Sequence, residues 1–222
     1  FCSVNTGKPV WDDPDEPRRT ALAVKQMGLK HCVITSVNRD ELHDSGAAIW
    51  AETVREVHRA NPQCTVEVLI PDMCNEDEPL RTVFEARPEI LGHNMETVSR
   101  LYSTVRPQAK YEWSLDVLKK SKSFGLRAKT AFMLGLGEKA EEVFALMEDI
   151  FHTGCDILAI GQYLQPTKKH HPVERYIHPD EFDVYKKTGL EMGFGWVEAG
   201  PLVRSSYHAD KQSTLTATPI HV

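Results

Sequence analysis

The sequence of 222 residues has no long hydrophobic run, no excess of positive charge and no pair of closely spaced cysteines. A membrane-spanning helix needs roughly 20 consecutive apolar residues, so none is expected, and nothing resembles a targeting segment. The 26 Lys and Arg are outnumbered by 32 Asp and Glu, which gives a net charge of −6. This balance gives no reason to expect a nucleic-acid partner.

The five cysteines are odd in number and widely spaced: Cys2, Cys32, Cys64, Cys74 and Cys155. This pattern is not a disulfide framework or, by itself, a metal site, and it fits a reducing cytoplasm or organelle matrix. Cys32, Cys64 and Cys155 are predicted to be buried and inert, because they adjoin apolar strands or a helix end. Cys2 is either an ordinary residue or the last cysteine of a motif whose other members lie outside this sequence.

Short apolar runs alternate with helical stretches along most of the chain. Strand character occurs at 31–37, 65–72, 89–94, 127–137 and 156–164, and helical spacing at 16–28, 46–62, 79–88, 96–107, 114–125, 140–154 and 179–193. Such alternation predicts parallel strands with right-handed crossovers. Five or six units fit either a doubly wound sheet or a barrel.

Polar residues cluster directly after the apolar runs, in TSVNRDEL, PDMCNEDE, HNMETV, GLGE, QYLQP and GPLVRSSYH. In a barrel these positions form the carboxyl-terminal mouth, where active sites lie. Six such stretches favour an α/β fold with a partial (β/α)6, TIM-like barrel. We expect the barrel to span 1–203, with 204–222 as a C-terminal segment and tail packed on its mouth.

Several polar stretches also have a structural interpretation. The Gly-rich turn MLGLGE opens a helix, but Glu138 and the acids after it would repel a phosphate, so these acids are predicted to complement the helix dipole. His93, at a strand end, is predicted to be a hydrogen-bonded structural residue rather than a metal ligand. His170 and His171 adjoin two lysines, which favours a solvated basic loop that faces an acidic partner over a metal site.

The stretch TSVNRDELHDSG holds more polar side chains than helix capping by Asp44 and Ser45 needs. We therefore favour ligand contacts here, and its acidic character suits an amino group or ribose hydroxyls better than an anion. No periodicity explains the run RSSYH at 204–208, which composition alone would assign to a loop.

Taken together, VITSVNRDEL, VEVLIPD, HNMETV, MLGLGE, IGQYLQP and GPLVRSSYHA resemble, in order, the motifs of the lipoyl synthase family of radical S-adenosylmethionine (SAM) enzymes. The resemblance covers 1–212, and it implies the partial barrel of the radical SAM type. It also implies insertion of two sulfur atoms into a protein-bound octanoyl chain. In this family FCSVNTGKP would end a CxxxCxxC motif, so Cys2 would be the third thiolate of a SAM-binding 4Fe–4S cluster. The chain as given is expected to be inactive without the upstream cysteines.

The resemblance also implies an auxiliary 4Fe–4S cluster that donates sulfur, with one serine of RSSY as a ligand. That ligand is Ser205 or Ser206, and the sequence leaves the choice open. The SAM contacts that the resemblance implies are Thr35, Ser36, Asn38, Glu67, Asp72, Asn94, Lys129 and Gln162. Lys129 would offer a cation to the SAM carboxylate.

The implied partners are octanoylated lipoyl carrier domains, namely the E2 subunits of 2-oxoacid dehydrogenases and the H protein of glycine cleavage. Flavodoxin or ferredoxin would be the reductant. The implied location is the bacterial cytoplasm, with a mitochondrial or plastid matrix as the alternative. Two other functions stay open: a radical SAM sulfur inserter of the biotin synthase type, which the RSSY run argues against, and a non-catalytic barrel that binds SAM or an acylated carrier.

Overall fold

The computed structural model describes residues 13–213, so Cys2 lies outside the described residues, as does the tail beyond Ser213. All six strands are parallel and lie in chain order, β1-β2-β3-β4-β5-β6. Their bounds are β1 His31–Thr35, β2 Thr65–Leu69, β3 Ile90–Gly92, β4 Arg127–Leu134, β5 Ile157–Gln162 and β6 Trp196–Gly200. A doubly wound sheet reverses its strand order at a switch point, whereas a barrel does not. The predicted partial barrel is therefore confirmed.

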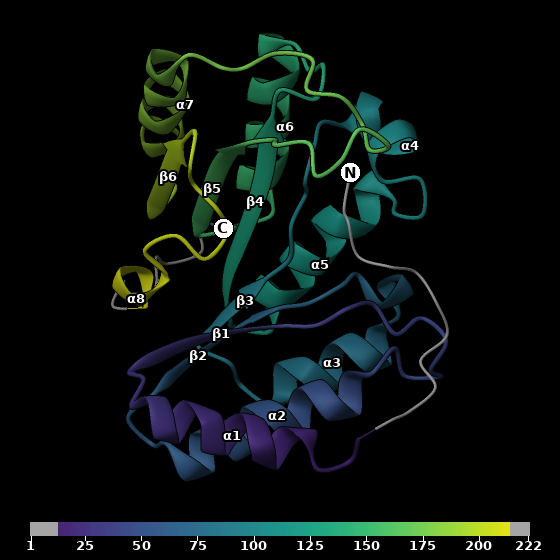
Figure 1. The fold of residues 1–222 in the computed structure, drawn as a ribbon, viewed down its shortest axis with the longest axis vertical. Coiled ribbons are helices and arrows are strands. Elements are labelled where there is room, and N and C mark those ends of the chain that lie inside the picture. The colour runs from purple at the N-terminus through teal and green to yellow at the C-terminus, as the bar shows by residue number, and fades with distance from the viewer. Residues whose placement is uncertain (1–12, 214–222) are drawn as a thin grey trace.

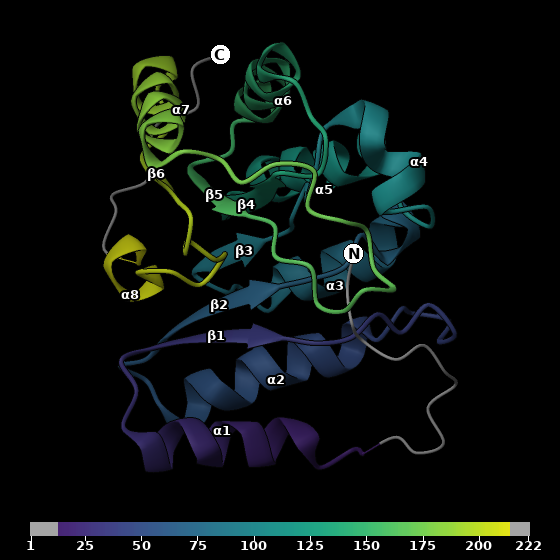
Figure 2. The ribbon, with the colours of Figure 1, turned by 45° about the horizontal axis from the view of Figure 1, so that its top comes forward.

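The helices lie along the outer face of the curved sheet, while α8 lies on its other side (Figures 1 and 2). Their bounds are α1 Glu16–Met27, α2 Ala47–Ala60, η1 Met73–Asn75, α3 Asp77–Glu85, η2 Ser99–Leu101, α4 Tyr102–Val105, α5 Tyr111–Ser123, α6 Ala140–His152, α7 Pro179–Met192 and α8 Ala209–Gln212. The outer helices therefore leave the inner face of the sheet free for a functional site.

The core lies between the sheet and the outer helices, in two clusters. One surrounds β1 and β2 with α1, α2 and α3, and the other surrounds β4 and β5 with α5, α6 and α7. Strand side chains alternate between faces, so Val66 and Val68 enter the core while Glu67 faces the barrel interior. The alternation gives the interior its chemistry.

Three cysteines are buried as predicted: Cys32, Cys64 and Cys155. Burial raises the pKa of the Cys32 and Cys155 thiols to about 12. Thiols with such values are poor nucleophiles, so these residues act as small apolar side chains.

The predicted helix over 96–107 is wrong at its start. Glu96 has φ +65° and forms a parallel bridge with Phe132, and only η2 and the short α4 follow. The backbone N–H of Glu96 donates to the Ala131 carbonyl (3.1 Å), and its carbonyl accepts from the N–H of Met133 (2.9 Å). Pairing with β4 thus outweighs the local helical spacing.

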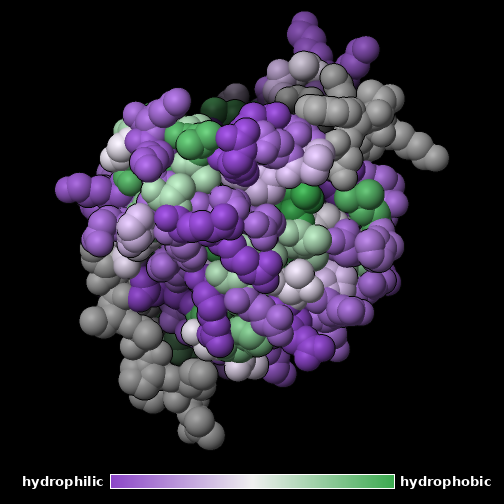
Figure 3. All heavy atoms as spheres, turned by 90° about the horizontal axis from the view of Figure 1, so that it is seen from below, coloured by the Kyte–Doolittle hydropathy of each residue, from purple (hydrophilic) through white to green (hydrophobic). Residues whose placement is uncertain are grey.

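Figure 3 shows the side of the molecule where α1 and α2 lie. This surface is mostly hydrophilic, with scattered hydrophobic residues. Across 13–213 we find no helix that is both long and apolar enough to cross a membrane.

Candidate functional site

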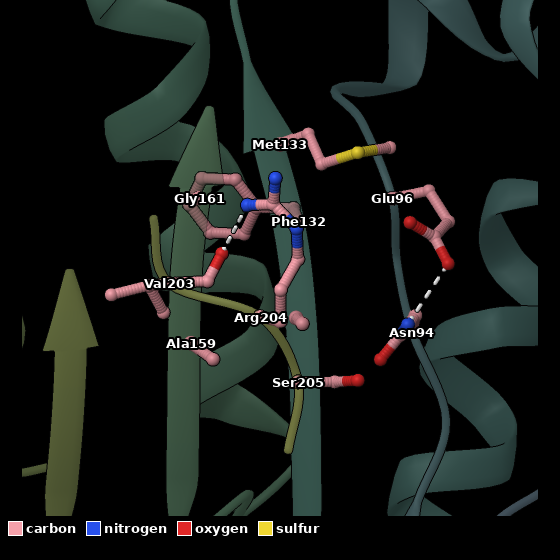
Figure 4. A pocket seen from close by; sticks show the side chains of 10 residues that line it. Asn94, Glu96, Phe132, Met133, Ala159, Gly161, Val203, Arg204 and Ser205 are labelled. Carbon is pink, nitrogen blue, oxygen red and sulfur yellow. Dashed lines mark hydrogen bonds between the residues drawn. The ribbon is translucent and has the colours of Figure 1, made fainter. Parts of the chain in front are cut away.

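A cavity opens on the inner face of the barrel, between β4, β5, the loop after β3 and the segment after β6 (Figure 4). The space in it that a water-sized molecule can reach is about 110 Å³. Its lining residues are Asn94, Glu96, Ala131, Phe132, Met133, Ala159, Gly161, Val203, Arg204 and Ser205. Apolar walls with a few convergent polar groups are typical of a ligand site.

Asn94 and Glu96 form the polar side of this cavity. The Asn94 amide donates to Glu96 Oε1 at 2.9 Å, and both side chains reach the cavity from the loop after β3 (Figure 4). Burial raises the pKa of the Glu96 carboxyl, which the charge of Arg106 partly offsets. The sequence predicts a site role for Asn94 but not for Glu96, because HNMETV indicates a helix that begins at Glu96.

The C-terminal segment supplies the opposite side of the cavity. Arg204 Nη1 donates to the Val203 carbonyl at 2.7 Å, and Ser205 lines the cavity with its hydroxyl directed towards Asn94 (Figure 4). Ser206 is exposed and does not line it. The close approach of this segment depends on Gly161, where a Cβ would lie 2.3 Å from the Val203 carbonyl oxygen.

Glu67 and Lys129 form an ion pair that faces the barrel interior, with 2.8 Å between Lys129 Nζ and Glu67 Oε1. Both side chains are only 2% exposed. His31 Nε2 lies 3.6 Å from Glu67 Oε2, and neither atom has a hydrogen-bond partner among the described residues. Burial lowers the pKa of Lys129 more than its carboxylate partner raises it. Lys129 lies two residues before Ala131 and on the same face of β4. Because Ala131 lines the cavity, the ion pair lies one pleat away from it.

The other predicted SAM contacts do not line this cavity. Thr35, Ser36 and Asn38 are exposed at the carboxyl end of β1. Asp72 accepts from the backbone N–H of Cys74 at 3.2 Å, which caps η1. Gln162 points to the helix side of β5, where its amide donates to Leu134, Tyr163 and Arg175 carbonyls and accepts from Ile177 N–H.

Polar residues in three of these stretches make contacts within the protein. Glu138 accepts from the backbone N–H groups of Gly135 (2.7 Å) and Leu136 (2.9 Å), so a carboxylate already occupies the donors that a phosphate would need. His170 contacts Thr167 Oγ1 and His171 contacts the Leu136 carbonyl, so the two rings serve different partners. Asp44 caps α2 through the N–H groups at 46 and 48. The part of the chain from 13 to 213 contains no group of three or more His, Cys, Asp or Glu arranged to hold a metal.

Both ring nitrogens of His93 have hydrogen-bond partners inside the protein. Its Nδ1 lies 2.9 Å from the Ile70 carbonyl and its Nε2 lies 3.0 Å from Ser114 Oγ. Burial, and then the charge of Arg106, lowers the pKa of His93 from 6.5 to about 4.

This shift predicts a pH-dependent loss of stability. Between pH 6.5 and about 4 the unfolded chain binds a proton at His93 that the folded chain excludes, so the unfolding free energy falls as the pH falls through this range. The full loss would be up to about 3 kcal/mol. Urea unfolding at several pH values checks this, and His93→Gln should have a flatter profile in this window. A variant as steep as the wild type would contradict the assignment.

Comparison with known proteins gives consistent matches. The model of the radical SAM superfamily matches residues 1–150. The lipoyl synthase of Rubrobacter xylanophilus is 56% identical over 96% of this chain and 67% of its own length. The lipoyl synthase of Bacteroides fragilis and the mitochondrial lipoyl synthase of Nematostella vectensis are each 54% identical, over 95% of this chain and 73% of their lengths.

Solved structures agree on the fold. Streptococcus suis SuiB bound to the precursor peptide SuiA has a TM-score of 0.69 at 10% identity, and covers 95% of this chain and 47% of that one. Methylornithine synthase has a TM-score of 0.61 at 15% identity, over 84% of this chain and 61% of its own. At these identities the likeness concerns the barrel alone.

Proposed function

Because this chain belongs to the lipoyl synthase family of radical SAM enzymes, we propose that it inserts two sulfur atoms into a protein-bound octanoyl chain to form the lipoyl group. The observation that carries the proposal is the meeting of Asn94, Glu96 and Ser205 in one cavity on the inner face of the barrel. These residues come from the loop after β3 and from the RSSY run, more than 100 positions apart.

The family uses a 4Fe–4S cluster and SAM, and the residues of this chain fit SAM. The carboxylate of Glu96 and the amide of Asn94 suit ribose hydroxyls, and the apolar walls Ala131 and Ala159 suit an adenosyl group. Within residues 13–213 the buried Lys129 ammonium pairs with one carboxylate, that of Glu67, so it can also pair with a ligand carboxylate. Thr35, Ser36, Asn38 and Asp72 stay predicted contacts at the open strand ends. Gln162 also stays a predicted SAM contact. To reach SAM, its amide would have to break several of its present hydrogen bonds.

We further propose two clusters. Cys2, with two cysteines upstream, would hold the cluster that binds SAM, and Ser205 rather than Ser206 would be the serine ligand of the auxiliary cluster. Ser205 is favoured because it lines the cavity, whereas Ser206 is exposed.

The chemistry separates into what the cofactors supply and what the chain supplies. SAM on a reduced cluster supplies a radical strong enough to take hydrogen from an unactivated carbon, which no side-chain acid or base can do. The chain's own residues bind and orient: Asn94 and Glu96 hold one side of the cavity, and Val203 and Ser205 hold the other. The apolar wall between them excludes water from the reacting carbon.

The substrate is attached to a protein, and we propose octanoylated E2 domains of 2-oxoacid dehydrogenases and the H protein of glycine cleavage as its carriers. Flavodoxin or ferredoxin would supply the electrons. These assignments rest on the family and on the open cavity.

The proposal is tested on the full-length gene product after anaerobic reconstitution. Two clusters correspond to about eight iron atoms per chain. With SAM, dithionite and an octanoyl-lysine peptide, mass spectrometry should show the peptide gaining two sulfur atoms. SAM cleavage without sulfur insertion would point to another radical SAM reaction, and a protein that binds no iron would favour a non-catalytic barrel.

A further inference from the structure

The loop that carries Asn94 and Glu96 accepts hydrogen bonds from the side chain of Arg106. We infer that Arg106 is a positioning residue, which fixes the backbone of this loop and thereby sets the affinity of the cavity for SAM. The inference rests on the proposed function, since it concerns the same cavity. Arg106 itself does not line that cavity.

Arg106 contacts the loop through one end of its guanidinium. Its Nη1 donates to the carbonyls of Asn94 (3.0 Å) and Met95 (3.4 Å). The same nitrogen lies 3.1 Å from the Tyr102 hydroxyl and 3.3 Å from Ser114 Oγ. One side chain therefore connects the loop to both α4 and α5.

Further contacts support Met95. The Tyr102 hydroxyl donates to the Met95 carbonyl at 2.8 Å, and the Met95 N–H donates to Thr130 Oγ1 at 3.2 Å. The guanidinium carbon of Arg106 lies 5.3 Å from the centre of the Tyr102 ring. The side chain is thus restrained by an aromatic face as well as by its acceptors.

The loop needs this support because Glu96 has a strained backbone. Its φ of +65° lies in the left-handed region, which costs a residue with a Cβ about 1–2 kcal/mol. Such a conformation persists only where its surroundings impose it. Arg106 and Tyr102 bind the carbonyls immediately before Glu96, so they act on the residues that set its direction.

A lysine cannot replace Arg106 in this role. The planar guanidinium offers several donors in a fixed fork and packs on the ring, whereas an ammonium is a point charge with rotating donors. Lysine keeps the positive charge near Glu96, so Arg106→Lys tests geometry rather than charge.

The test measures the dissociation constant for SAM in the reconstituted holoenzyme, together with the melting temperature. Arg106→Lys should weaken SAM binding about tenfold, equivalent to about 1.4 kcal/mol. Tyr102→Phe keeps the ring but removes the donor to Met95, and should weaken binding in the same direction by a smaller factor. This variant also serves if Arg106→Lys does not fold.

Arg87→Lys is a matched control. Arg87 lies over the Phe124 ring at 4.6 Å and donates to the Phe124 carbonyl at 3.3 Å, so it makes the same kinds of contact away from the cavity. It should lower the melting temperature without changing SAM affinity.

Either of two outcomes would overturn this inference and leave the proposed function standing. One is unchanged SAM binding in both Arg106→Lys and Tyr102→Phe, and the other is an equal loss of SAM affinity in Arg87→Lys. A wild-type holoenzyme that binds no SAM would overturn the proposed function and this inference with it.

Discussion

Replacing Ser205 with alanine is expected to reduce sulfur insertion roughly 100-fold or more, since even indirect supports of a metal site cost up to that factor when removed. SAM cleavage should continue, because Asn94, Glu96 and Lys129 are unchanged. The hydroxyl of Ser205 is the only part of the RSSY run, apart from Arg204, that lines the cavity within the described residues. Loss of that oxygen removes the proposed fourth ligand of the auxiliary cluster.

Ser206→Ala is the matched control, since it makes the same chemical change at the next residue. Ser206 is exposed, and its described contact is made by its backbone carbonyl, which accepts from Ala209 N–H at 3.3 Å. Its alanine variant should keep wild-type activity. The measurements are iron and sulfide per chain, SAM cleavage and the sulfur content of the peptide product. Loss of activity in Ser206→Ala with a normal Ser205→Ala would reverse the assignment.

The choice between these serines depends on an orientation that the sequence does not determine. The run RSSY was identified from its unusual composition and its resemblance, but a segment without regular structure has no period that fixes which side chain points inward. The orientation of Ser205 depends on the contact between this segment and β5, two elements that are distant in the sequence.

The strands and most helices could be predicted because their apolar periodicity is local. Residues 31–35 and 65–69 combine β-branched side chains with short length, and α2 has clear helical spacing. There were two exceptions. No strand was predicted over β6, and from Glu96 hydrogen bonds to β4 replace the expected first helical turn. Tertiary pairing therefore also explains why Glu96 was missed as a site residue.

The sequence likewise could not predict that Glu67 and Lys129 form an ion pair. Each was assigned separately as a SAM contact, yet their contact follows from strand register. Glu67 is level with Ile90 and Arg127, while Lys129 is level with Gly92 and Leu69, so the ion pair joins β2 and β4 diagonally across β3. Register depends on all the strands together, so no local pattern could predict this ion pair.

Gly161→Ala is expected to have an effect as large as that of Ser205→Ala, although it touches no proposed ligand. A Cβ at Gly161 would lie 2.3 Å from the Val203 carbonyl oxygen, which is too close for any relaxed contact. The segment 203–205 must therefore move away from β5 and take the Ser205 hydroxyl with it. A misplacement of about 1 Å at a reacting site can cost about 100-fold in rate.

Gly200→Ala is the control for this prediction, because Gly200 pairs with Gly161 across β5 and β6. A Cβ there would meet only Val203 Cγ2 at 3.4 Å, an ordinary contact. We expect Gly200→Ala to keep wild-type sulfur insertion and Gly161→Ala to lose it together with iron from the auxiliary cluster, while both still bind SAM. If Gly161→Ala keeps full activity, the close packing of the C-terminal segment on β5 does not position Ser205. In that case contacts other than those with the sheet position Ser205.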